Sequence, residues 1–258
     1  MALSEIKIEQ ISQILRTSLR NKLAHYHPEP NSMPFHTRLL GKDRLALFSF
    51  IQSLNTNFGT TIFEPIAVEL ALIRYKSASR QVTVGNYISE QAQGEIQRII
   101  DGLITIESTP NKSEEIDRVR KVCQKDKMVN VNPTKVDLLV EDNSGELFLF
   151  DIKTAKPNVG QYKEFKRTLI EWVAIMLAND PNLKIESAVA IPYNPYYPKP
   201  YVRWTIRGML DLKSELYVAE KFWDFLGGEG SFEGLLDIFE RVGIELRPEI
   251  DATFANFV

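Results

Sequence analysis

The sequence predicts a single α/β domain with helical additions, and three observations support this fold class. Dense β-type sequence begins at Val136 and runs as VDLLVEDNSGELFLFDIK. Stretches with apolar residues at helical spacing precede and follow it. The chain shows no internal repeat, low-complexity tract or clear linker. We therefore expect one domain over residues 1–258, with a mainly helical part at 1–107, an α/β core at 130–210 and a helical part at 211–258.

The N-terminal elements follow from the spacing of apolar residues. We expect helices over residues 4–24, 43–54, 62–77 and 90–104. Within them, the pattern predicts that the following side chains, among others, are buried: Leu45, Leu47, Phe48, Ile51, Ile66 and Leu72. We expect a proline-containing loop at 27–36 and a polar connection at 55–61. Residues 108–135 are polar and charged, which indicates a loop or a short helix.

The C-terminal elements alternate in type. After the β-type run we expect a helix over residues 161–177 and a strand over 185–193. A segment rich in proline and tyrosine follows the strand. The last third is expected to be helical around 214–226 and 231–242.

Composition indicates a cytoplasmic protein. The single cysteine, Cys123, cannot form an internal disulfide, which fits a reducing compartment. The N-terminus lacks the pattern of a signal peptide, and no stretch of 18 or more apolar residues occurs. We therefore expect a soluble protein without a membrane partner.

Charge is distributed unevenly although the net charge is only −3. Residues 153–213 contain ten basic and five acidic side chains, whereas residues 214–258 contain three basic and ten acidic ones. Binding a polyanion needs a local positive surface and does not need a basic protein. The distribution is therefore compatible with a nucleic-acid partner, and equally with charges that interleave on the folded surface.

A hairpin is predicted within residues 136–153. A three-residue loop, Asn143-Ser144-Gly145, would pair the residues on either side of it and place the glycine where positive φ is needed. In that register, paired residue numbers sum to 288, so Asp137 falls opposite Asp151. Opposed Cβ atoms lie roughly 4.5–5.5 Å apart, so the two carboxylates can share one cation. Lys153 is two residues beyond Asp151 and therefore projects from the same face.

Two acids and a lysine on such a strand predict a magnesium-dependent centre. The hairpin strand that leads to Asp151 is apolar on both faces, as in a buried central strand. Two carboxylates without a counter-charge would destabilise the fold there. Mg²⁺ takes oxygen ligands, retains waters and would offset that cost. The ion would activate a water for phosphodiester hydrolysis, with Lys153 orienting that water or stabilising charge on the phosphate. The alternative is that Asp137 and Lys153 form an ordinary surface salt bridge.

These residues resemble the catalytic motif of the PD-(D/E)XK nuclease superfamily, read as Asp137, a hairpin and Asp151-Ile152-Lys153. Val136 stands where the nominal proline would be. The resemblance implies a restriction-endonuclease-like core, with a mixed central β-sheet flanked by helices. It also implies that Asp137 and Asp151 bind Mg²⁺ with the Ile152 carbonyl as a further ligand, and that Lys153 serves the attacking water.

The same resemblance implies a glutamate from a helix that precedes the hairpin. Glu64 is the first choice for this role and Glu69 the second. The alternative is that Glu64 stabilises the first turn of its helix through the macrodipole.

Four further segments are similar to a group of type II restriction endonucleases: residues 34–35, 55–59, 193–197 and 222–228. This resemblance implies a prokaryotic homodimer that cuts a short palindrome in duplex DNA, with GGNCC as a candidate target, and a companion DNA methyltransferase. Two alternatives stay open at this point. One is a DNA repair or junction-resolving nuclease of the same superfamily, and the other is a non-catalytic DNA-binding module.

Basic residues that follow the motif are candidates for phosphate contact. Lys163, Lys166 and Arg167 share one face of the expected helix, and Lys156 precedes it. Phosphate contacts would determine the affinity for DNA and the position of the protein on it, but not its sequence specificity. The alternative is a solvated face in which acidic residues are mixed.

Residues 193–207 are the candidate for reading bases. Prolines at 195, 198 and 200 would stiffen a loop that reaches into a groove. Asn194 could pair with adenine, and Lys199, Arg203 or Arg207 with guanine. The alternative is a rigid surface loop packed by its own aromatic residues.

Overall fold

The computed structural model describes residues 3–26, 33–153, 155–156, 161–201 and 208–255. The chain forms two compact units, one made of residues 1–69 and 229–258 and the other of residues 70–228. The single-domain organisation inferred from the sequence, with divisions near 107, 130 and 210, stays a prediction.

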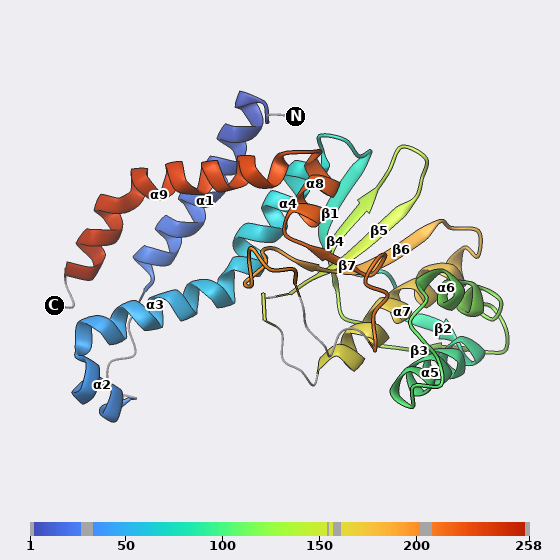
Figure 1. The fold of residues 1–258 in the computed structure, drawn as a ribbon. Coiled ribbons are helices and arrows are strands. Elements are labelled where there is room, and N and C mark those ends of the chain that lie inside the picture. Colours follow the sequence, from blue (N-terminus) through green and yellow to red (C-terminus); the bar gives the residue numbers. More distant parts are fainter. Residues whose placement is uncertain (1–2, 27–32, 154, 157–160, 202–207, 256–258) are drawn as a thin grey trace. The chain divides into compact units, whose positions relative to one another are not determined.

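The first unit is helical (Figure 1). It contains α1 (Glu5–Ala24), α2 (Pro34–Leu40), α3 (Lys42–Phe58), the π-helix η1 (Gly59–Phe63), most of α4 (Glu64–Ala71) and α9 (Ser231–Ala255). The Ser4 hydroxyl caps α1 by accepting a hydrogen bond from the Lys7 amide at 3.4 Å. Two ion pairs connect α1 to α9, from Arg16 and Arg20. The expected helix at 4–24 is confirmed.

The buried face of α3 differs from the expected one. Leu45 is buried as predicted, but Leu47, Phe48 and Ile51 are about half exposed. Apolar residues occupy more than one face of this helix, so their spacing alone does not select which face packs. The polar connection expected at 55–61 is also wrong, because α3 runs to Phe58 and η1 continues directly from it.

The second unit is built on a mixed five-stranded sheet with the order β1-β4-β5-β6-β7. Its strands are β1 (Ser77–Val82), β4 (Val136–Glu141), β5 (Leu147–Ile152), β6 (Ile185–Ile191) and β7 (Leu216–Val218). The pairs β1–β4 and β4–β5 are antiparallel, whereas β5–β6 and β6–β7 are parallel. A separate two-stranded ribbon joins β2 (Tyr87–Ser89) to β3 (Met128–Asn130). The mixed central sheet implied by the resemblance is confirmed.

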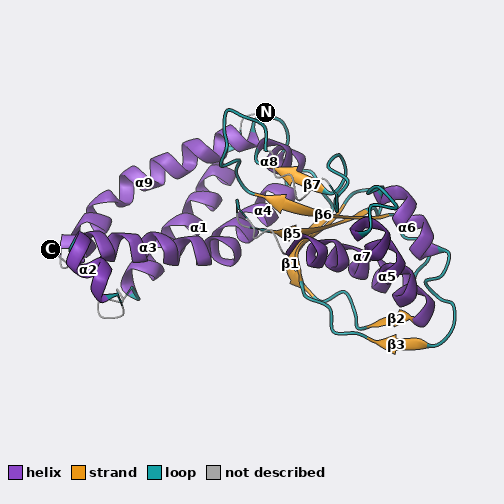
Figure 2. Ribbon diagram, turned by 60° about the horizontal axis from the view of Figure 1, so that its bottom comes forward, coloured by secondary structure: helices purple, strands orange, loops and turns teal. Residues whose placement is uncertain are grey.

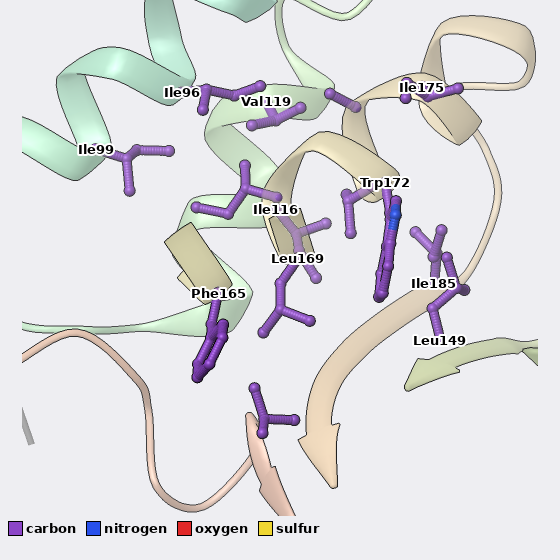
Figure 3. Close-up of a cluster of buried hydrophobic side chains, with 14 of the residues drawn as sticks. Ile96, Ile99, Ile116, Val119, Leu149, Phe165, Leu169, Trp172, Ile175 and Ile185 are labelled. Atoms are coloured by element: carbon purple, nitrogen blue, oxygen red, sulfur yellow. The ribbon is translucent and has the colours of Figure 1, made fainter. Parts of the chain in front are cut away.

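Helices flank this sheet. They are α5 (Glu90–Ile104), α6 (Lys112–Arg120), α7 (Tyr162–Asn179) and α8 (Glu220–Gly227). Figure 2 shows α5 and α7 gathered along one side of the sheet. Apolar side chains of α5, α6 and α7 meet Leu149 of β5 and Ile185 of β6 (Figure 3), and Trp172 of α7 is fully buried among them. Phe222 and Phe225 of α8 pack edge to face against Phe150, with ring centroids 5.4 and 5.6 Å from its own.

Several elements confirm the sequence analysis, and others correct it. Helices α5 and α7 and strand β6 lie close to where the spacing predicts. The helix expected at 62–77 ends at Ala71, Leu72 is exposed, and residues 77–82 form a strand. The helix expected at 214–226 begins only at Glu220, because Leu216–Val218 pair with β6. A three-residue strand is too short to show a periodicity of its own.

Four charged side chains form a buried ionic cluster in the second unit. Lys166 on α7 bridges Glu115 on α6 and Glu215 before β7, at 2.5 and 2.6 Å. Lys112 on α6 pairs with Glu215 at 3.1 Å and donates to the Ser187 hydroxyl at 2.6 Å. Two cations thus balance two anions, and all four groups are almost completely buried.

The pKa values of this cluster follow from burial and pairing. Burial lowers the pKa of Lys112 and raises that of Glu115. Burial alone would also raise the pKa of Glu215, but its two lysine neighbours outweigh that effect, and the net pKa is lowered. The cluster therefore holds α6, α7 and the segment before β7 together. Removing any one of the four charged side chains would leave a buried charge unbalanced.

Replacing Lys166 with methionine should strongly destabilise the protein. The substitution keeps the side-chain length but leaves Glu115 and Glu215 without a shared cation, which should cost about 3–5 kcal/mol. Urea unfolding of Lys166→Met measures the loss. Lys163→Met is the matched control, because Lys163 is exposed on the same helix and should matter little. Equal unfolding midpoints for the two variants would contradict the clamping role.

Candidate active site

The hairpin of β4 and β5 has the register that the sequence predicts. Leu138 pairs with Phe150 and Leu139 with Leu149, so partner numbers sum to 288. The Gly145 amide donates to the Asp142 carbonyl at 3.2 Å, and Gly145 has φ +85°. A residue with a Cβ would be strained there. The three-residue loop and the role of its glycine are confirmed.

The turn is reinforced by the side chain of Asp142. Its Oδ1 accepts hydrogen bonds from the amides of Ser144 and Glu146 at 2.7 and 2.9 Å. These bonds favour the carboxylate, and the pKa of Asp142 is lowered, chiefly by the Glu146 amide and the Ser144 hydroxyl. The turn therefore holds the register that the rest of the hairpin follows.

Continuing this register by one pair places Asp137 opposite Asp151. The Ile152 amide donates to Asp137 Oδ2 at 2.8 Å, so the carboxylate of Asp137 lies against β5. Asp151 is only 4% exposed. The Lys153 ammonium lies 2.6 Å from Asp151 Oδ1. The three residues that the sequence selects are thus connected through one short stretch of the hairpin.

Lys153 is held on several sides. Its amide donates to the Ala190 carbonyl at 2.9 Å, which continues the pairing of β5 with β6 beyond the end of the strand. Its ammonium lies 5.0 Å from the centroid of the Phe165 ring on α7, within the range of a cation–π contact. The side chain is about one-third exposed. The ammonium is therefore anchored yet open to solvent.

The ion pair differs from the one considered in the sequence analysis. Lys153 pairs with Asp151, whereas Asp137 accepts hydrogen bonds from the Ile152 amide and from Gln81, whose Nε2 lies 3.2 Å from Asp137 Oδ1. Two carboxylates and one ammonium carry a combined charge of −1. A partly buried group with negative charge and oxygen donors is suited to a hard cation.

The donor set also suits an ion that keeps part of its water shell. Asp137, Asp151 and the Ile152 carbonyl offer only oxygen atoms, which Mg²⁺ prefers over nitrogen or sulfur. Within the ranges that the structure describes, no group of three or more His, Cys, Asp or Glu side chains is placed to hold a metal. A site with two carboxylates is sufficient for Mg²⁺ when waters complete the coordination.

The predicted third acid lies in the other compact unit. Glu64 begins α4 and is only 2% exposed. Glu69, the second choice, forms an ion pair with Lys7 at 2.7 Å. The participation of Glu64 in the site stays a prediction.

The structure corrects one of the four phosphate-contact candidates. Lys166 is fully buried in the ionic cluster and cannot meet a phosphate, because α7 turns that position towards α6. Lys156 and Lys163 are exposed. Arg167 is partly exposed and donates to Gln97 Oε1 at 2.7 Å on the surface. Helical spacing places these side chains near one another but does not tell which of them faces inwards.

The base-reading candidates have mixed outcomes. The Asn194 amide donates to the Lys199 carbonyl at 2.7 Å and its Oδ1 accepts from the Tyr196 amide at 3.0 Å, so Asn194 shapes the loop and is not poised to pair with adenine. Lys199 is exposed. Arg203 and Arg207 lie outside the described residues.

Sequence reasoning missed two neighbours of the site, Gln81 and Phe165. Gln81 lies on β1, whose sequence SASRQV lacks apolar alternation and so gives no strand signal. Phe165 could have been found, because α7 follows the motif directly and an aromatic residue in its first turns is placed to cover the end of β5. Neither residue carries a catalytic signature of its own.

A family model for the HinfI type II restriction endonucleases matches residues 4–243. The chain belongs to this family. Like the other type II restriction endonucleases, it is a site-specific deoxyribonuclease, and DNA is its partner. Type II restriction endonucleases generally use a divalent metal ion, with which the oxygen donors described above agree. The family match thus selects restriction over the repair and non-catalytic alternatives.

Individual relatives support the assignment over most of the chain. The type II restriction enzyme HgiCII of Herpetosiphon aurantiacus is 25% identical over 232 residues, covering 88% of this chain and 84% of its own. MjaII of Methanocaldococcus jannaschii is 28% identical, covering 94% of this chain and 72% of its own. HgiBI of Herpetosiphon aurantiacus is 22% identical, covering 97% of this chain and 98% of its own.

Among the described helices, none combines the length and apolar character needed to cross a membrane.

Proposed function

We propose that this restriction endonuclease hydrolyses phosphodiester bonds of duplex DNA at a short palindromic site, with Asp137, Asp151 and Lys153 as its catalytic residues. The observation that supports this most directly is the hairpin register, which brings Asp137 opposite Asp151 and Lys153 next to Asp151. Mg²⁺ is the proposed ion, held by the two carboxylates and the Ile152 carbonyl. Glu64 is retained as a candidate further acid.

The residues of the proposed centre have different roles in hydrolysis. Bound Mg²⁺ would supply Lewis acidity and a more acidic water at the scissile phosphate. Asp137 and Asp151 would bind the ion and fix its position, because their carboxylate oxygens come from adjacent strands. An ammonium carries no lone pair, so Lys153 acts by orienting the attacking water and stabilising negative charge on the phosphate. Phe165 excludes water from one side of that ammonium, which strengthens its electrostatic effect.

DNA contact is proposed at the edge of the sheet where β5 and β6 end. These strands are parallel, so the residues that follow each of them emerge at the same edge. Lys153 and Lys156 follow β5, and the loop with Lys199 follows β6. Lys156 also lies over the Tyr196 ring, 5.5 Å from its centroid, which connects the two segments. Lys163 and Arg167 extend the basic surface along α7.

The residues proposed to read guanine are Arg203 and Arg207, together with Lys199. Arginine binds the major-groove edge of guanine in a bidentate manner, and lysine can make a similar contact. GGNCC is the candidate target. Sequencing the ends of digested plasmid DNA identifies the site directly, and a target without guanine would contradict this assignment.

A homodimer is proposed because a palindrome presents the same sequence on both strands. In this proposal each chain contributes one catalytic centre, on β4 and β5, so cutting both strands symmetrically calls for two copies related by a twofold axis. A companion DNA methyltransferase is proposed to protect the host genome from the enzyme.

Lys153→Ala should abolish cleavage while DNA binding is largely retained. Removing an electrostatic stabiliser of the transition state costs on the order of 10²–10³ in turnover. Cleavage of plasmid DNA with Mg²⁺ measures the rate, and gel-shift titration without Mg²⁺ measures binding. Lys125→Ala is the control, since it changes an exposed lysine outside both the proposed centre and the proposed DNA-contact surface and should keep the cutting rate within a few-fold. Full activity of Lys153→Ala would remove Lys153 from the mechanism.

Asp137→Asn and Asp151→Asn should each weaken metal binding and cutting severely. Both changes keep the shape of the side chain but remove a negative charge from the oxygen donors. Isothermal titration with Ca²⁺ reports ion uptake, and digestion with Mg²⁺ reports activity. Asp117→Asn is the control, because Asp117 is exposed on α6 and belongs neither to the hairpin nor to the proposed centre. Unchanged uptake by both catalytic-site variants would show that the ligands are wrongly assigned.

A further inference from the structure

A residue in the left-handed region interrupts β1 directly beside the proposed centre. Arg80 pairs with Leu138 and Val82 with Val136, so Gln81 lies opposite Asp137 on the neighbouring strand. Gln81 has φ +55°, although β1 is otherwise paired regularly with β4. A residue with a side chain in this conformation costs about 1–3 kcal/mol, and such residues cluster at functional sites.

The side chain of Gln81 reaches the carboxylate that it faces. Its Nε2 donates to Asp137 Oδ1 at 3.2 Å, whereas the Ile152 amide donates to Oδ2 at 2.8 Å. One oxygen is therefore held from β1 and the other from β5. A carboxylate has about four lone-pair sites, so accepting these two hydrogen bonds is compatible with binding a cation.

We propose that Gln81 is a positioning residue that sets the orientation of the Asp137 carboxylate, and that its strained backbone is the cost of aiming this side chain. The proposal rests on the proposed function of Asp137 as a metal ligand. It goes further by assigning a role to β1, from which no catalytic residue comes.

The chemistry of the amide suits this role better than that of a charged group. A lysine or arginine at this position would neutralise Asp137 and compete with the cation for its oxygens. An amide donates a hydrogen bond without adding charge, so the carboxylate keeps its affinity for a metal ion. Partners that orient metal ligands typically change metal affinity or activity by about 10–100-fold when they are removed.

Two substitutions separate the hydrogen bond from the strain. Gln81→Met keeps the length of the side chain and the strained backbone but lacks the donor. Gln81→Gly also lacks the donor, yet glycine adopts positive φ without strain. Both variants should lower kcat by about 10-fold or more with little change in KM for DNA, and both should weaken Ca²⁺ binding in calorimetry by about 10-fold. Urea unfolding should find Gln81→Gly the more stable of the two variants.

Ser79→Gly is the matched control, because Ser79 is exposed on the same strand two residues earlier. It should leave kcat and Ca²⁺ affinity unchanged. Wild-type kcat and Ca²⁺ affinity in Gln81→Gly would overturn the proposal, since the strain would then serve no purpose at Asp137.

Asp137→Asn, assayed in the same experiment, tells this failure from a failure of the proposed function. If Asp137→Asn is inactive and the Gln81 variants are unaffected, only the role of Gln81 falls. If Asp137→Asn is fully active, the assignment of Asp137 falls and the role of Gln81 with it.

Discussion

The antiparallel pairing of β4 with β5 is the constraint on which the proposed site depends. Side chains alternate between the two faces of a strand, so a slip of one residue would move Asp137 to the opposite face from Asp151. The Asp142 side chain and the positive φ of Gly145 fix the turn and therefore the register. Hydrogen bonds at the turn of the hairpin thus determine how Asp137 and Asp151 face each other at its open end.

The second constraint is the placement of α7 against the sheet. Lys166 and Phe165 are adjacent on this helix but serve different neighbours, the buried carboxylates and the Lys153 ammonium. The ionic cluster allows little freedom, because a shift of α7 would separate charges that are fully removed from water. The environment of Lys153 is therefore supported by packing that lies deeper in the unit.

The sequence was sufficient for the features that depend on local pattern. The turn residues and the apolar runs beside them predicted the hairpin, its register and the proximity of Asp137, Asp151 and Lys153. It could not tell that Lys166 is buried, because Lys166 stands in the charged segment YKEFKR, and nothing there indicates the distant Glu115 and Glu215 that compensate it. Strand β1 and the conformation of Gln81 were also out of reach, because they arise from pairing with β4 rather than from the segment SASRQV itself.

The central claim is that two carboxylates on adjoining strands share one cation. A crystal structure of the protein grown with Mn²⁺ tests it most directly, because anomalous scattering locates the ion without assumptions about its ligands. The account predicts a peak about 2.1 Å from oxygens of both Asp137 and Asp151, with the Ile152 carbonyl beside it. A bound ion elsewhere in the chain, with none between these two carboxylates, would contradict it.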